Sequence, residues 1–320
     1  MPITFDDVTA ARQRLAPYLS PTPLRQYATL DDETGVRVLV KHENHLPTNA
    51  FKARNTLSFL TALSPQQRTQ GVIAATRGNH GAGLAWAGMQ LGVRVTICVP
   101  HGNNPEKNAA IRGFGAELIE AGCDYDAAVD VAKRLVRERG LVLAHSTNDR
   151  DVIAGAATLS VEICEQADRL DAIVVAVGGG SQAVGALIAT RQLRPDVRVY
   201  GVQAAGASAI HDSWHRKERV VTAQATTFAD GLATRSTYDL TWEPLRDGLA
   251  GFVAVSDAEI AGAIRLYLRT THNLAEGAGA AGLAGLVKLR DELAGKTVAV
   301  ILSGSNIDGE TLRRVLSGEL

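Results

Sequence analysis

The sequence alternates short apolar runs rich in β-branched residues with longer stretches of helical periodicity. Several runs carry few polar residues, as strands buried on both faces do. The expected strands are 38–42, 72–76, 94–100, 172–177, 197–203 and 297–302. The expected helices are 79–91, about 125–138, about 153–167, 181–193, 257–271 and about 278–293. This order predicts an α/β chain with mostly parallel sheets.

The bulk properties limit the class of protein. A chain of 320 residues suits one large or two medium domains. A net charge of -1, without a long basic run, argues against a nucleic-acid or membrane-surface partner. No run of 18 uninterrupted apolar residues occurs. The N-terminus is acidic where a secretory signal is basic, and Cys98, Cys123 and Cys164 are expected as buried thiols of a reducing compartment. We therefore expect a cytoplasmic protein.

Three predicted strands lead directly into polar, glycine-bearing turns, at 76–81, 177–181 and 302–306. Ligands of open α/β sheets bind beyond the carboxyl ends of the strands, where these turns lie. A single glycine turn could serve only to reverse the chain. Three such turns together favour a shared ligand.

The run Gly178-Gly179-Gly180-Ser181 follows a strand and opens a helix. Small residues leave backbone N–H groups free to face an anion, and the helix N-terminus adds about half a positive charge, so a phosphate fits. The run also matches a dinucleotide fingerprint, which needs an acidic residue at the end of the next strand. That strand ends in Gln203 and alanines. An NAD(P)-dependent oxidoreductase is therefore the weaker alternative.

Other cofactor signatures are missing from the sequence. It has no GxxxxGK[ST] phosphate loop, no HExxH and no clustered His and Cys ligands, so we expect no catalytic zinc. His42, His45 and His80 are interpreted as structural residues rather than metal ligands.

Lys52 is one of seven lysines and precedes a helical stretch. Most lysines are solvated surface charges. Ala50 and Phe51 give this one a partly apolar setting, which lowers a lysine pKa and frees the amine to attack a carbonyl.

The chain resembles the fold-type II pyridoxal-phosphate (PLP) enzymes, the family of threonine/serine dehydratases and serine racemases, from about residue 18 onward. The motifs that carry the resemblance, in order, are Pro21-Thr22-Pro23-Leu24, Asn49-Ala50-Phe51-Lys52, Gly78-Asn79-His80, Val152-Ile153-Ala154-Gly155, Gly178-Gly179-Gly180, Ala229-Asp230-Gly231 and Leu302-Ser303-Gly304-Ser305-Asn306.

The resemblance implies a role for each matching residue. Lys52 would carry PLP as a Schiff base and move the Cα proton, and Phe51 and Gly231 would flank the pyridine ring. Asn79 would bind its 3′-oxygen and Ser303 would face its nitrogen. The phosphate would be held by Gly178, Gly179, Gly180, Ser181 and the Gln182 amide. The substrate carboxylate would be received by Thr76, Arg77, Gly78, Asn79 and His80.

The resemblance also implies a fold and an activity. The fold would be of the tryptophan synthase β type, with two open, mostly parallel sheets flanked by helices. A small mobile domain, 49–145, would close on a large domain made of 1–48 and 146–320. The enzyme would be a homodimer or higher oligomer that converts a β-hydroxy amino acid such as threonine or serine to a 2-oxo acid and ammonia, in amino-acid catabolism. A lyase for 3-hydroxyaspartate or phenylserine, a β-replacement synthase, a racemase and a non-catalytic PLP-binding protein remain alternatives.

Three positions depart from the family pattern. Asn49 stands where glycine is usual before the lysine segment. Arg77 replaces the serine with which racemases act on the opposite substrate face, and an arginine is a poor base. Gln203 and Ala209 replace the carboxylates of the divalent cation site, so no metal is expected.

Overall fold

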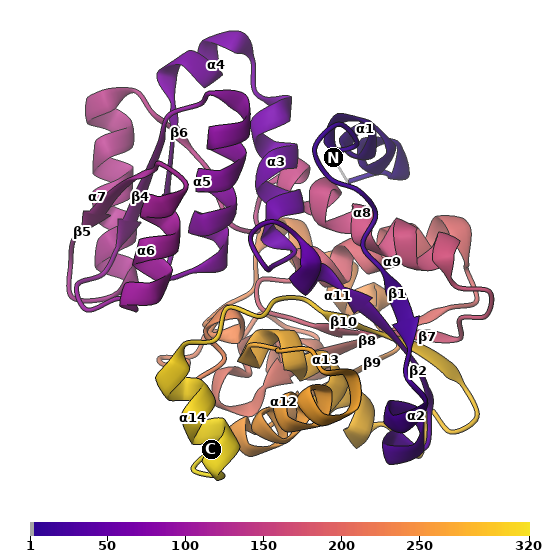
Figure 1. The fold of residues 1–320 in the computed structure, drawn as a ribbon. Coiled ribbons are helices and arrows are strands. Elements are labelled where there is room, and N and C mark those ends of the chain that lie inside the picture. Colours follow the sequence, from indigo (N-terminus) through magenta and orange to yellow (C-terminus); the bar gives the residue numbers. More distant parts are fainter. Residues whose placement is uncertain (1–2) are drawn as a thin grey trace.

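The computed structural model describes residues 3–320, which contain two separate β-sheets flanked by helices (Figure 1). This agrees with the predicted α/β class and its two mostly parallel sheets. Two chain segments, one before and one after the smaller sheet, build the larger one.

Within the described residues, the larger sheet has six strands in the order β1-β2-β10-β7-β8-β9. β1 is antiparallel to β2, and the other neighbours are parallel. The bounds are β1 (Leu24–Gln26), β2 (Arg37–His42), β7 (Ala172–Ala176), β8 (Arg198–Ala204), β9 (Gly251–Val255) and β10 (Thr297–Leu302).

The smaller sheet is parallel throughout, with the order β5-β4-β3-β6. Its strands are β3 (Val72–Ala75), β4 (Val95–Val99), β5 (Glu117–Glu120) and β6 (Val142–Leu143). In Figure 1 this sheet and the helices α4 to α7 form the upper left part of the molecule.

Most of the helices pack against the two sheets. Their bounds are α1 (Phe5–Leu15), α2 (Ala28–Thr34), α3 (Lys52–Ala62), α4 (Pro65–Gln70), α5 (Asn79–Leu91), α6 (Pro105–Gly113), α7 (Tyr125–Arg139), α8 (Arg150–Gln166), α9 (Ser181–Leu193), α10 (Ala209–Arg216), α11 (Asp239–Gly248), α12 (Asp257–Thr271), α13 (Gly277–Lys288) and α14 (Gly309–Ser317). Three short 3₁₀ turns are η1 (Glu43–His45), η2 (Ala205–Ala207) and η3 (Asp230–Leu232).

All six expected strands and all six expected helices are present, with small shifts at their ends. Helix α8 begins at Arg150 rather than near 153, because the Asp149 side chain accepts a hydrogen bond from the Val152 N–H and caps the helix. Helix α13 ends at Lys288 rather than near 293. The prediction that all three cysteines are buried is wrong for Cys123, which is exposed in a turn, whereas Cys98 and Cys164 are buried.

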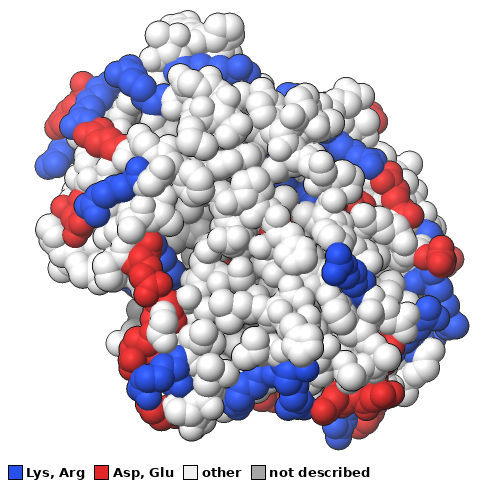
Figure 2. Space-filling view, in the orientation of Figure 1, with Lys and Arg blue, Asp and Glu red and all other residues white. Residues whose placement is uncertain are grey.

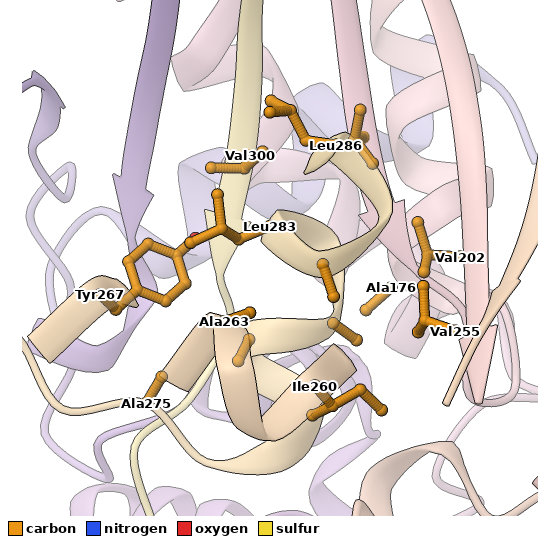
Figure 3. Packing of buried hydrophobic residues seen from close by; sticks show 14 of the residues in the cluster. Ala176, Val202, Val255, Ile260, Ala263, Tyr267, Ala275, Leu283, Leu286 and Val300 are labelled. Carbon is orange, nitrogen blue, oxygen red and sulfur yellow. The ribbon is translucent and has the colours of Figure 1, made fainter. Parts of the chain in front are cut away.

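The larger sheet is buried on both faces, as its apolar strands predict. Val298 and Val300 of β10 belong to a core with α12 and α13, whereas Ala299 and Ile301 belong to a core with α8 and α9. Figure 3 shows the first of these cores, where Leu283 of α13 lies beside Val300. Each fully buried aliphatic side chain contributes about 1.5–3 kcal/mol.

The surface carries charges of both signs. Figure 2 shows blue and red side chains mixed around the rim of one face, whose middle is largely uncharged. Among the described helices, none is both long and apolar enough to cross a membrane.

Candidate active site

A cavity of about 670 Å³ lies where turns from both sheets meet. The turns after β3, β7 and β10 line it, so the residues come from the carboxyl ends of parallel strands, as predicted. Every residue that the sequence analysis singled out as a site residue lines this cavity. These residues are Phe51, Lys52, Thr76, Arg77, Gly78, Asn79, His80, Gly178, Gly179, Gly180, Ser181, Gln182, Gly231 and Ser303.

Lys52 is the first residue of α3, and its Nζ donates a hydrogen bond of 2.9 Å to the carbonyl oxygen of Ser146. The same Nζ lies 5.0 Å from the centre of the Phe51 ring. Burial lowers the pKa of Lys52 from 10.5 to about 8. About a tenth of this amine is therefore neutral, and nucleophilic, at pH 7, far more than of a lysine with the ordinary pKa.

The segment before Lys52 is fastened to the turn that contains Ser303. The Phe51 N–H donates to the Ser303 carbonyl at 2.9 Å, and Ala50 pairs with Gly304 in an antiparallel bridge. Asn49 has a φ of 54°, a left-handed conformation that asparagine tolerates better than most residues other than glycine. The asparagine that replaces the usual glycine is therefore compatible with the sharp turn that the chain makes here.

The glycine run after β7 is packed so closely that side chains are excluded. A Cβ on Gly178 would lie 2.1 Å from the carbonyl oxygen of Gly231, and a Cβ on Gly179 would lie 2.3 Å from the Thr147 Oγ1. Gly180 has a φ of 100° and caps the N-terminus of α9. The first amides of a helix have no partner within it, so this turn can hold an anion such as a phosphate.

Asn79, the first residue of α5, has both ends of its side-chain amide engaged. Its Nδ2 donates to the Glu276 Oε1 at 2.6 Å, and its Oδ1 accepts from the Asn306 Nδ2 at 2.7 Å. Glu276 and Asn306 also line the cavity, and the sequence analysis did not identify them as site residues.

The predicted substrate turn, 76–80, contains side chains with different surroundings. Arg77 is exposed and lines the cavity. His80 is buried, with its Nε2 3.2 Å from the Ala144 carbonyl, and burial together with the nearby Lys52 lowers the His80 pKa to about 3. The imidazole is therefore neutral, and no partner is present for its Nδ1 within residues 3–320.

Two ion pairs connect helices α6 and α7, which flank the smaller sheet, to the segment between α10 and α11. The Lys107 Nζ lies 2.6 Å from the Asp230 Oδ2, and Arg235 pairs with Asp126. All four residues line the cavity. Tyr125 and Tyr238 also line it, and burial raises the pKa of Tyr125 to about 12. None of the four ion-pair residues was predicted as a site residue.

No group of His, Cys, Asp and Glu side chains with the arrangement of a metal site occurs in residues 3–320. Gln203 is buried, and its Oε1 accepts from the backbone N–H groups of Ile210 and His211. This side chain therefore fixes the start of α10.

The chain is similar to known proteins over nearly its whole length, both in sequence and in structure. The family model described as "Pyridoxal-phosphate dependent enzyme" matches residues 15–304. The chain is 35% identical to the L-threonine ammonia-lyase of Thermotoga maritima over 98% of its own length and 78% of that protein. It is 32% identical to an L-threo-3-hydroxyaspartate ammonia-lyase of Pseudomonas sp., over 98% of this chain and 99% of the relative. The structure of maize serine racemase superposes with a TM-score of 0.94 at 27% identity, covering 100% of this chain and 98% of that one.

Proposed function

The chain belongs to the family of pyridoxal-phosphate-dependent enzymes, and we propose that it is an ammonia-lyase that converts a β-hydroxy amino acid to a 2-oxo acid and ammonia. The observation that carries this proposal is the position of Lys52. Its amine, with a pKa lowered to about 8, lies in a cavity that also contains a glycine turn at a helix N-terminus.

The residues of the cavity fit PLP. Lys52 would hold it as a Schiff base, and the amides of the run Gly178–Gln182 would hold the phosphate. Close packing of Gly178 against Gly231 supports this role, since a side chain there would collide with the Gly231 carbonyl and displace the turn. Phe51 and Gly231 would flank the ring.

Two polar residues would bind the heteroatoms of the pyridine ring. Asn79 would donate to the 3′-oxygen, and the Ser303 hydroxyl would face the ring nitrogen. The Ser303 Oγ has a weak contact of 3.5 Å with the Ala278 carbonyl, so the hydroxyl is available to a ligand. A neutral hydroxyl leaves the ring nitrogen largely unprotonated, which favours prompt loss of a β-hydroxyl over reactions that need a long-lived carbanion.

When bound, PLP withdraws electrons from the substrate Cα. Lys52 would remove the Cα proton, and turn 76–80 would bind the substrate carboxylate. The His80 ring in that turn is neutral and therefore adds no positive charge to the carboxylate site. Arg77 is a poor base, so an elimination fits this cavity better than racemisation.

The organisation of the chain forms part of the same proposal. Residues 49–145 would be a small mobile domain that closes on a large domain of 1–48 and 146–320. The enzyme would act in the cytoplasm as a homodimer or higher oligomer.

Borohydride reduction of the pure protein tests the proposal. We expect visible PLP absorbance that borohydride removes, a reduced PLP adduct on the peptide that contains Lys52, and 2-oxo acid formation from threonine or serine. Lys52→Ala should abolish the adduct and turnover. Lys133→Ala, at an exposed lysine on α7, is the matched control. An NAD(P)-dependent oxidoreductase would show no such absorbance, and an adduct retained in Lys52→Ala would contradict the assignment.

A further inference from the structure

Glu276 immediately precedes α13, and its carboxylate lies between two donors from distant segments. Its Oε1 accepts the 2.6 Å hydrogen bond from the Asn79 Nδ2, and the backbone N–H of Asn306 also donates to the carboxylate. Burial raises the pKa of Glu276, whereas the positive charge of Lys107 and the Asn79 hydrogen bond oppose that rise.

The main chain fixes the position of this carboxylate. The Glu276 N–H donates to the Gly304 carbonyl at 3.1 Å. A Cβ on Gly304 would lie 2.5 Å from the Glu276 Oε1, so the glycine leaves the space that the carboxylate occupies. Glu276 is therefore held against the same turn that fastens the Lys52 segment.

These contacts determine which way the Asn79 amide points. An ionised carboxylate accepts hydrogen bonds but cannot donate them, whereas the Asn306 Nδ2 can only donate. The observed orientation satisfies both neighbours, with Nδ2 toward Glu276 and Oδ1 toward Asn306. A half-turn of the amide would place two acceptors against each other and two donors against each other. The second N–H of the Asn79 Nδ2 remains for a ligand in the cavity.

We propose that Glu276 is a positioning residue that holds Asn79 with its N–H toward the cofactor, so that the amide can donate to the 3′-oxygen of PLP. This inference rests on the proposed function, because it needs PLP in the cavity. The hydrogen bond that the Asn79 Oδ1 accepts from Asn306 polarises the same amide, which strengthens its N–H groups as donors.

A double-mutant cycle of Glu276→Gln and Asn79→Ala tests this role. The quantity measured is the affinity of the apoenzyme for PLP, by titration. Glu276→Gln keeps the shape of the side chain but can present either a donor or an acceptor to Asn79. We expect PLP binding to weaken about tenfold, with a shifted visible absorbance maximum. In an Asn79→Ala background the same substitution should change affinity by about twofold or less, since the amide to be oriented is gone.

Glu276→Asp shortens the side chain by one methylene and so moves the carboxylate away from Asn79. We expect it to weaken PLP binding as Glu276→Gln does, and it replaces that variant in the test if the glutamine variant folds poorly. Glu106→Gln is the matched control, because Glu106 lines a neighbouring pocket beside Asn79 but its carboxylate accepts from the Gly309 N–H instead. Unchanged PLP affinity in both Glu276 variants, or a loss that adds fully to that of Asn79→Ala, overturns the inference. If the unmodified protein binds no PLP, the proposed function itself fails.

Discussion

The Lys52 Nζ is 2.9 Å from the carbonyl oxygen of Ser146, and among residues 3–320 no carboxylate forms an ion pair with it. Burial alone accounts for the lowered pKa of about 8. The nearby rings of His80 and His145 also have lowered pKa values, for which burial is the main cause and the Lys52 charge the next. Burial therefore raises the fraction of the neutral amine, which is the form that attacks an aldehyde.

This setting predicts how capture of PLP by the apoenzyme depends on pH. The capture rate should rise about tenfold per pH unit below pH 8 and level off above it, because the neutral amine is the reactive form. Between pH 8 and 10.5 the unfolded chain binds more protons at this lysine than the folded one, so the free energy of unfolding should rise with pH. Stopped-flow absorbance and urea unfolding check the two parts. A rate that keeps rising to pH 10 would mean that Lys52 has an ordinary pKa.

Gly178→Ala should disrupt the phosphate turn, because the new Cβ would lie 2.1 Å from the Gly231 carbonyl oxygen. Backbone atoms cannot move aside as a side chain can, so we expect PLP affinity to fall on the order of tenfold or more. Gly262→Ala is the control, since the nearest non-adjacent side chain to a Cβ at this position of α12, among residues 3–320, is Arg265 at 3.9 Å. That variant should bind PLP normally and unfold at a slightly higher temperature. Normal PLP affinity in Gly178→Ala would show that the turn can relax.

A buried ionic cluster holds α3, and with it Lys52, against the larger sheet. Arg54 contacts Glu43 at 2.7 Å and Glu162 at 2.6 Å, and Lys41 contacts Glu162 at 2.6 Å. All four side chains are buried. Two positive and two negative charges balance one another, so removal of one leaves an uncompensated buried charge.

Arg54→Ala should therefore lower the free energy of unfolding by about 3–5 kcal/mol. Arg12→Ala is a matched control, because Arg12 makes an equally short contact of 2.6 Å with Glu165 but both partners are exposed. The control should lose about 1 kcal/mol or less. Urea unfolding curves of the two variants provide the comparison. Equal losses in the free energy of unfolding would contradict the claim that burial makes the Arg54 ion pairs costly to break.

The sequence predicts those parts of the site that depend on local pattern. Lys52, the glycine turn and the Ser303 turn each follow from residues next to a strand or helix end. The partners Asn79 and Glu276 are 197 positions apart, and Lys107 and Asp230 are 123 apart, so no local pattern joins them. One signal for Glu276 was present, since it is the single charged residue in the Ala/Gly-rich run 275–286.

The strands that the sequence analysis missed have a similar explanation. β6 has two residues, and β5 begins and ends with glutamate, so neither forms an apolar run. β1 has three residues and is held by its antiparallel pairing with β2. β9, with the sequence GFVAV, does carry the apolar pattern of a strand and could have been predicted.

Arg77 differs from the other arginine that lines the cavity. Arg235 is paired with Asp126, whereas no hydrogen bond or ion pair engages Arg77 in the part of the chain that the structure describes. Its backbone belongs to turn 76–80, in which the Gly78 N–H donates to the Thr76 Oγ1. An arginine free of partners at the cavity can form a bidentate pair with a carboxylate of the substrate.

If that carboxylate is on the substrate side chain, 3-hydroxyaspartate should be a better substrate than threonine, serine or phenylserine. Arg77→Ala should then lower kcat/KM for 3-hydroxyaspartate roughly ten- to hundredfold relative to serine, because a charge-assisted pair contributes about 1.5–3 kcal/mol. Arg235→Ala, which removes the paired arginine from the same cavity, should leave the ranking of the four substrates in place. If Arg77 binds the α-carboxylate instead, all four substrates should lose by a similar factor. An unchanged kcat/KM for every substrate would make Arg77 a surface residue, and the residues that select the side chain would have to be sought around Tyr125 and Tyr238.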